Sequence, residues 1–329
     1  MVWRIHFTTD DLARIQVSPT LGPLSETVFA MSLIRGCDMQ PRSLFGAWRS
    51  QVSSKVTPRM RALTDLIPPG SRGVDLCTLT GQAPTIEQGL AALLTVPREQ
   101  MLVEMGLFER WHRLPASAWS LAEPGGREPL ADAMLAAHRV LIEPYWARML
   151  ACLEAEQVVR RRTLASGGPG RLLASLQNER IRWRPPVLEV LTCNNADLYL
   201  EGRGLSLVPS VFTGKMPNLI HDPSRPSATP RIILPASDER VRACGLWDGP
   251  RSNGAALAAL VGRNRAAVLG AVADGCTTTE LAGRVGISIA AASQHASVLR
   301  EAGLITSSRL GGAMLHALTP LGAGLLQAG

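Results

Sequence analysis

The chain has 329 residues, of which 46% are hydrophobic, and its formal net charge is +7. This length allows two domains with buried cores, and the basic balance favours an anionic partner. No apolar stretch reaches the roughly 20 residues that span a bilayer, the first residues lack a secretory signal, and the six cysteines lack zinc-site spacing. We therefore expect a cytoplasmic protein with no metal site and no contact with a membrane.

Up to about residue 180, apolar side chains recur at helical spacing between prolines and glycines. The pattern predicts helices over Ser25–Ile34, over Leu44–Leu66, and over 86–110 with an interruption at Pro97. The longest predicted helical stretch is Pro129–Leu173. In it, Pro144 predicts a kink or the start of a second helix, and the run Gly167–Gly170 predicts the end.

From about residue 181 the apolar period changes to two, which is typical of strands. The predicted strands are Val187–Leu191, Arg231–Leu234, and a hairpin of Leu198–Leu200 and Leu205–Val208 around the turn Glu201–Gly204. We therefore expect an α+β fold that is mainly α. Its first domain spans residues 1–247, is helical to about 180, and carries a small antiparallel sheet within 181–236.

The composition changes after Trp247. All seven Trp lie at or before this residue, and residues 248–329 contain no Phe, Trp or Tyr. The next residues are turn formers, which suits a connection between domains. The sequence predicts a linker over 248–256 and a second domain over 257–329.

The second domain carries ordered signals for short helices. Arg265–Ala273 is apolar on one face, and Thr277 and Glu280 have the spacing of a capping box that opens the next helix. Gly286 is the expected left-handed stop of that helix, and Ser288 offers a second N-cap. The helix Ile289–Ala302 should follow. Two short helices joined by a glycine-containing turn predict a helix-turn-helix, whose second helix reads the DNA major groove.

The residues that follow predict a wing. Leu304–Ser308 and Ala313–Leu318 alternate as strands, with Arg309–Gly312 as the connecting tip. Thr319 and Pro320 then provide an N-cap and first-turn proline for a last helix that ends near Gln327. The order of these elements is that of a winged helix.

The segment Thr277–Gly322 resembles the ArsR-type winged-helix transcriptional regulators, most strongly where Ala302-Gly303-Leu304-Ile305 closes the recognition helix. This resemblance covers about 255–329 and implies a bacterial DNA-binding regulator associated with the nucleoid. Residues 201–210 resemble an uncharacterised domain that precedes this winged helix in actinobacterial regulators. Metal-sensing members carry a Cys-x-Cys pair in the first helix of the helix-turn-helix, whereas this chain has Thr279–Gly283 there. Gln294 also replaces an Arg of many relatives.

If Ala292, Ala296 and Leu299 face inward, the opposite face of the recognition helix faces DNA. The candidate DNA contacts on this helix are Ile289, Ala290, Ser293, Gln294 and Ser297, with Ala291 and His295 at the flanks. Gln pairs bidentately with adenine, and an alanine methyl packs on thymine. Thr278 and Ser288 lie at helix N-termini and suit phosphate contacts, and Arg309 suits insertion into the minor groove. Alternatively, these are small and polar residues on a solvated face.

From residue 251 onward, six Arg stand against Asp274, Glu280 and Glu301, a net charge of +3. This modest charge should bind double-stranded DNA weakly as one copy. We therefore expect a homodimeric regulator, a repressor that reads an inverted repeat. A small-molecule effector would bind the first domain. The candidate ligand residues are Trp111, Trp119, His138, Tyr145, Trp146 and Trp183, for which core packing is the alternative role.

No nucleophile elbow, HExxH pair or P-loop occurs in the chain. We therefore expect no enzymatic activity and no cofactor. The alternative hypothesis is an enzyme or scaffold whose winged helix serves only dimerisation or protein contacts.

Overall fold

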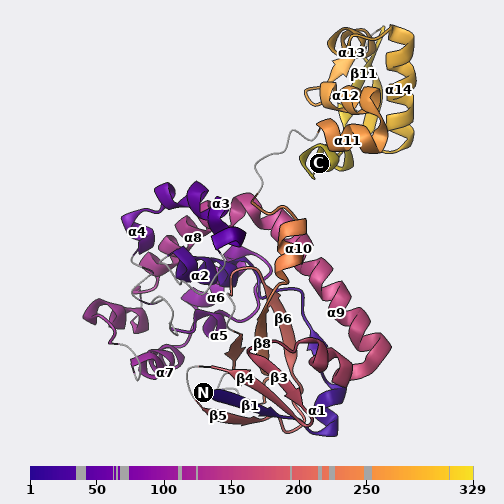
Figure 1. The fold of residues 1–329 in the computed structure, drawn as a ribbon. Coiled ribbons are helices and arrows are strands. Elements are labelled where there is room, and N and C mark those ends of the chain that lie inside the picture. Colours follow the sequence, from indigo (N-terminus) through magenta and orange to yellow (C-terminus); the bar gives the residue numbers. More distant parts are fainter. Residues whose placement is uncertain are drawn as a thin grey trace. The chain divides into compact units, whose positions relative to one another are not determined.

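The computed structural model describes residues 1–34, 42–61, 63, 66, 74–109, 113–123, 125–192, 195–213, 217–221, 227–247, 254–310 and 312–328. The chain divides into two compact units, Met1–Trp247 and Asp248–Gly329 (Figure 1). Of the predicted linker, residues 248–253 lie outside the described residues, and residues 254–256 already belong to a helix. No described helix is long and apolar enough to cross a membrane.

The first unit contains a helical part built around one large core. Its helices are α2 (Pro23–Ile34), α3 (Arg42–Val52), α4 (Pro58–Arg61), α5 (Leu76–Thr80), α6 (Ile86–Leu94), α7 (Arg98–Glu109), α8 (Glu128–Leu141) and α9 (Trp146–Ser175), with 3₁₀ turns at Ser53–Lys55, Ala116–Ala122 and Glu143–Tyr145. Fully buried Trp48, Met101 and Met134 lie in the core. The breaks at Pro97 and Pro144 are confirmed. The single helix over Leu44–Leu66 is wrong, because Pro58 lacks an N–H and disfavours helical backbone at Thr57.

Helix α9 does not end at the glycine run. Gly168 adopts φ 71 and ψ 179, which breaks the helix, but Pro169 suits a new first turn and helical backbone continues to Ser175. Leu172 and Leu173 are fully buried after the break. The predicted end is therefore a kink, because these two leucines anchor the continuation in a second hydrophobic core.

Two four-stranded sheets complete the unit. One has the order β3 (Ile181–Arg184), β4 (Val187–Leu191), β1 (Val2–His6), β5 (Ala196–Tyr199), and the other has the order β2 (Gln16–Val17), β6 (Ser206–Ser210), β8 (Arg231–Pro235), β7 (Asn218–Ile220). The short helices α1 (Thr9–Ala13) and α10 (Asp238–Ala243) flank the strands. The α+β class is confirmed, but the sheets are mixed: β1 pairs with β5, and β6 pairs with both β2 and β8, in parallel.

The predicted hairpin across Glu201–Gly204 is wrong, because β5 and β6 belong to different sheets. The connecting loop packs against α1 instead of forming a tight turn. The Gly204 amide donates to the buried Asp11 carboxylate over 3.0 Å. A Cβ at Gly204 would lie 2.3 Å from the Arg14 carbonyl oxygen, so only glycine allows this close approach.

The second sheet separates two cores. Leu207, Ile232 and Leu219 share one row and face the core beneath the first sheet. Val208 and Ile233, one row along, face the helical core on the opposite side, as the alternation of strand side chains requires. Glu26 of α2 ties the helical part to this sheet, because its buried carboxylate accepts hydrogen bonds from the amides of Val211 and Phe212, at 3.3 and 3.1 Å.

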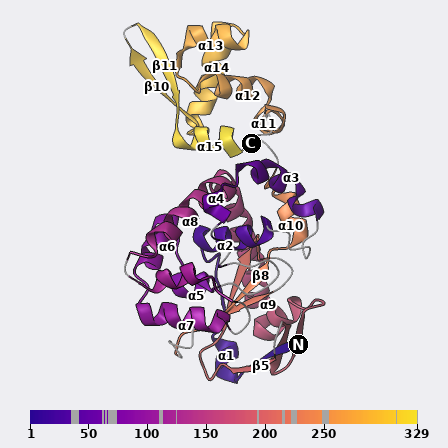
Figure 2. The ribbon, with the colours of Figure 1, turned by 90° about the vertical axis from the view of Figure 1, so that its left-hand side faces the viewer.

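The second unit has the predicted winged-helix order. It comprises α11 (Gly254–Val261), α12 (Arg263–Ala271), β9 (Cys276–Thr277), α13 (Thr278–Val285), α14 (Ile289–Glu301), β10 (Ile305–Leu310), β11 (Ala313–Leu318) and α15 (Pro320–Ala328), with strand order β10-β11-β9 (Figure 2). Its separate core includes Val268, Leu269, Leu281 and Leu299. The unit therefore has the buried apolar centre that an independent domain requires.

Candidate DNA-binding site

Local capping fixes the turn between α13 and α14. The Thr277 hydroxyl accepts from the Glu280 amide at 3.3 Å, and the Glu280 carboxylate accepts from the Thr277 amide at 2.8 Å, which completes the predicted capping box. These hydrogen bonds lower the pKa of Glu280. Gly286 ends α13 in the left-handed conformation, and the Ser288 hydroxyl accepts from the Ala291 amide at 3.2 Å. The first turn of α14 is therefore capped by the side chain of the residue that directly precedes it, Ser288.

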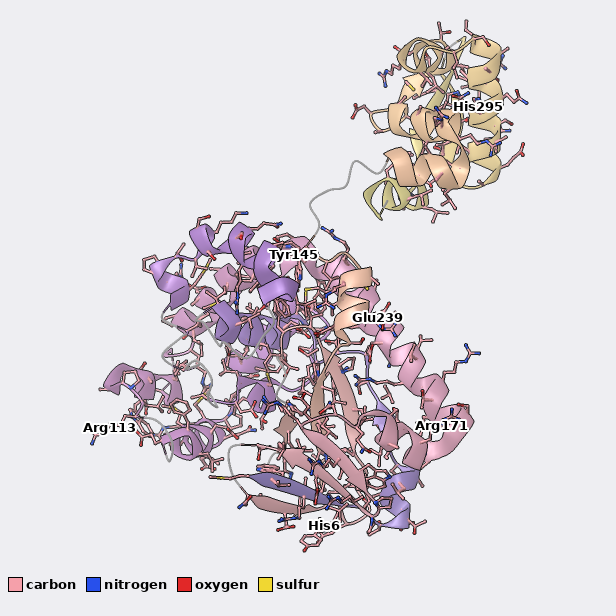
Figure 3. All side chains as sticks on the ribbon, viewed as in Figure 1. His6, Arg113, Tyr145, Arg171, Glu239 and His295 are labelled. Atoms are coloured by element: carbon pink, nitrogen blue, oxygen red, sulfur yellow. The ribbon has the colours of Figure 1, made fainter. Side chains whose placement is uncertain are left out.

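Helix α14 buries one face and exposes the other, as predicted. Ala292, Ala296 and Leu299 lie in the core, and the two alanines let α13 approach closely. On the opposite face the exposed candidates are Ser288, Ile289, Ala290, Ser293 and Gln294, and the half-buried ones are Ala291, His295 and Ser297. His295 is labelled in Figure 3. This distribution presents the amino-terminal half of α14 to solvent.

The exposed polar side chains differ in whether they already form hydrogen bonds within the protein. No hydrogen bond within the described residues engages the side chains of Ser293 and Gln294, so both are available to base edges. The Ser297 hydroxyl instead accepts from the Arg300 guanidinium at 3.1 Å and donates to the Glu301 carboxylate at 3.3 Å. Ser297 is therefore less available for a DNA contact than Gln294.

Arg309 lies one residue pair before the tip rather than on it. It belongs to β10 and pairs with Met314, and Leu310 pairs with Ala313 beyond it. The prediction that Arg309 starts the connecting tip is therefore wrong, since strand pairing continues through Leu310. The Arg309 side chain is exposed and has no ion-pair partner among the described residues. Because strand pairing fixes the backbone of Arg309, its side chain projects from a defined position on the wing.

A buried histidine that the sequence pattern did not single out joins the helix-turn-helix to the wing. The His316 side chain on β11 lies 2.9 Å from the Thr278 hydroxyl through Nε2 and 2.8 Å from the Ser307 hydroxyl through Nδ1. Burial, together with the charge of Arg300, lowers the pKa of His316. The imidazole therefore stays neutral at physiological pH, and Thr278, a predicted phosphate contact, already has a partner inside the protein.

The described candidate ligand residues of the first unit lie in two separate cores. Trp111 lies outside the described residues, whereas Trp119, Tyr145 and Trp146 pack on the helical core. The Tyr145 hydroxyl donates to Gln51 at 2.7 Å. Trp183 packs in the other core, edge-on to Phe7.

His138 is buried against the Thr27 hydroxyl at 3.4 Å, and its burial lowers its pKa. The described candidates therefore pack in two separate cores, which is the alternative role that their rings allowed. Within the described part of the chain, no three His, Cys, Asp or Glu side chains are grouped so that they could hold a metal ion.

Comparison with known proteins identifies the same region. A family described as a helix-turn-helix domain matches residues 263–308, from the start of α12 into β10. No curated protein and no solved structure matches the chain. The matched segment contains the capped turn and all of α14, so residues 263–308 are a helix-turn-helix domain of the kind found in DNA-binding regulators.

Proposed function

We propose that this protein is a homodimeric, sequence-specific transcriptional regulator of the bacterial cytoplasm and nucleoid. It would be a repressor of the ArsR type, and we assign it no catalytic role. The observation that carries the proposal is the exposed face of α14, where Ser293 and Gln294 stand unengaged directly after the capped turn. An α-helix of this kind fits the major groove, and its amino-terminal residues reach base edges. Arg309 on the wing would reach the adjacent backbone or minor groove.

Two features support a dimer. The net charge of +3 from residue 251 onward supplies few phosphate contacts, so a pair of winged helices would bind far more tightly than one. Leu260 on α11 and Leu321 on α15 are 75% and 63% exposed, and these helices lie beside each other in both ribbon views (Figures 1 and 2). Exposed leucines on adjacent helices suit a symmetric interface. A dimer would then read two half-sites about one helical turn apart.

An effector in the first unit would control repression by favouring one arrangement of the two recognition helices. Such control requires that the effector bind the DNA-competent and DNA-incompetent states with different affinity. Repression itself would follow from occupation of the operator.

The test is selection of genomic fragments by the purified full-length protein at near-physiological salt, followed by sequencing. The expected result is an enriched inverted repeat. The double variant Gln294→Ala/Arg309→Ala should lose this enrichment, whereas Arg182→Ala, an exposed arginine of β3 that changes the net charge equally, should retain it. Uniform, salt-labile capture would contradict sequence-specific binding. Enrichment that survives the double variant would show that another surface reads the DNA.

A further inference from the structure

A polar cavity lies in the first unit, against the second sheet. It has a volume of about 490 Å³, within the range of small-molecule sites. One wall is the sheet; the other includes the end of α5 at Thr80, the following Gln82, and the connection between α6 and α7 at Thr95. None of the candidate ligand residues named from the sequence lines it.

The strand register explains why the cavity is polar. Gln16, Ser206 and Arg231 are direct neighbours across β2, β6 and β8. Residues in one row across a sheet point to the same face, and all three line the cavity. Two residues further along β6 and β8, Val208 and Ile233 occupy the same face and pack into the helical core. On this face of the sheet, the row with Val208 and Ile233 is therefore apolar, and the row with Ser206 and Arg231, which lines the cavity, is polar.

Among the described residues that line the cavity, Arg231 carries the charge, which is positive. Arg231 is half-buried, and neither a hydrogen bond nor an ion pair joins its side chain to any described residue. The described residues that line the cavity include no Asp, Glu or Lys. A half-buried guanidinium with no carboxylate beside it among the described residues favours an anionic ligand group, to which it donates paired hydrogen bonds.

The hydroxyls of the lining complement a different kind of group. The hydroxyls of Thr80, Thr95 and Thr229 donate to the carbonyl oxygens of Leu76, Ala91 and Arg203, at 2.8, 2.9 and 3.0 Å. Each hydroxyl has a single proton, so its remaining lone pairs can only accept. The cavity thus combines a cationic donor with several acceptors, which suits a ligand that has one anionic group and several hydroxyl donors.

We propose that this cavity binds a small polyhydroxylated organic anion, a sugar acid or a sugar phosphate, with Arg231 facing its charged group. A second cavity of about 730 Å³ shares Gln16 and Thr229 with the first and is lined by Arg14, Arg203 and Glu201. The Arg14 and Arg203 guanidinium groups there already donate to backbone carbonyl oxygens, so Arg231 carries the proposal. Binding at this site is independent of the proposed function. That the ligand acts as the effector rests on the proposed function.

The test is isothermal titration calorimetry of the full-length protein, without DNA, against three probes: gluconate, glucose 6-phosphate and glucose. One anion or both should bind saturably with a Kd of about 1 mM or tighter, and glucose should bind at least about tenfold more weakly. The two anions distinguish a carboxylate from a phosphate ligand. Arg231→Gln should weaken anion binding by about 10- to 100-fold, whereas Arg182→Gln should not change it.

If Arg231→Gln unfolds thermally at the same temperature as wild type, its weaker anion binding is not caused by loss of folded protein. The proposal is wrong if neither anion binds saturably up to about 10 mM, if glucose binds as tightly as the anions, or if folded Arg231→Gln binds like wild type. Because the titration contains no DNA, its failure is distinct from a failure of the proposed DNA recognition. If an anion binds, fragment selection repeated in its presence tests whether it is the effector.

Discussion

His316 on β11 lies 2.9 Å from the hydroxyl of Thr278, the first residue of α13, and its other ring nitrogen lies against Ser307 on β10. One imidazole thereby joins the helix that precedes the recognition helix to the strand that carries Arg309. Because a neutral imidazole has one donor and one acceptor nitrogen, its protonation would oblige both hydroxyls to accept.

We predict that the winged helix loses stability as the pH falls below about 6.5. The folded pKa of His316 lies below its unfolded value, so its contribution is present above the unfolded pKa and is lost as the pH falls through the folded pKa. His316→Gln should lack this component. Residues 248–329 contain no Phe, Trp or Tyr whose fluorescence could report unfolding, so the measurement is amide hydrogen exchange of 254–310. Equal pH dependence in wild type and variant would contradict the prediction.

Two substitutions at Ser288 can distinguish its role as the N-cap of α14 from a role in DNA contact. Ser288→Ala should destabilise the second unit by about 1 kcal/mol, because the Ala291 amide loses its acceptor. Ser288→Asp keeps an acceptor at the N-cap but places a negative charge beside the phosphates. We expect near-wild-type hydrogen exchange and clearly weaker operator binding for Ser288→Asp. If Ser288→Asp binds the operator with wild-type affinity, the start of α14 does not lie in the DNA interface.

Arg309→Ala should reduce the salt dependence of DNA binding. If each wing contacts one phosphate, the slope of log K against log salt should decrease in magnitude by about 1 for each subunit. The pairing of β10 with β11 should survive, because the exposed side chain takes no part in the ladder. Fluorescence anisotropy over a salt series provides the slope. An unchanged slope would show that Arg309 faces solvent in the complex.

Glu26→Gln should stabilise the first unit at neutral and alkaline pH. Burial raises the pKa of Glu26 to about 7, although its hydrogen bonds with Phe212, Ser210 and Val211 act in the opposite direction. A raised folded pKa gives stability that is present below the unfolded value of 4.5 and is lost as the pH rises through about 7. The expected loss is on the order of 3 kcal/mol.

Urea unfolding followed by tryptophan fluorescence suits the Glu26 measurement, because every Trp lies in the first unit. Above pH 7 the glutamine variant should be more stable than wild type, and its stability should change less between about pH 5 and 8. His138, whose pKa is lowered, contributes a slope of the opposite sign in both proteins, so the difference between them isolates Glu26. Parallel pH profiles would show that the Glu26 carboxyl is not penalised by burial.

The winged helix could be predicted from the sequence because its signals are local. The capping box at Thr277, the stop at Gly286 and the N-cap at Ser288 each act within a few residues, and the structure contains all three. The sheets of the first unit depend on distant partners instead. Nothing near Val2–His6 indicates that it pairs with β4 and β5, and Asp11 meets Gly204 across 193 residues.

The candidate site, too, was predictable from the sequence only where its signals are local. The faces of α14 follow from helical spacing, so the exposed candidates were identified from periodicity alone. The role of His316 depends on two hydroxyls from different elements, one 38 residues away. The cavity of the first unit depends on the register of three strands, which the sequence alone does not determine.

The central position of β1 in its sheet has a consequence for synthesis. Val2–His6 is synthesised before both of the strands that flank it, which lie about 180 residues or more further along the chain. At about 5–20 residues per second, this segment waits on the order of 10–40 s for a partner. The helices between β2 and β3 contribute most of the helical core and can begin to condense during that interval. Sheet closure is then a late, slow step of high contact order, during which an unpaired strand is accessible to chaperones and to other nascent chains.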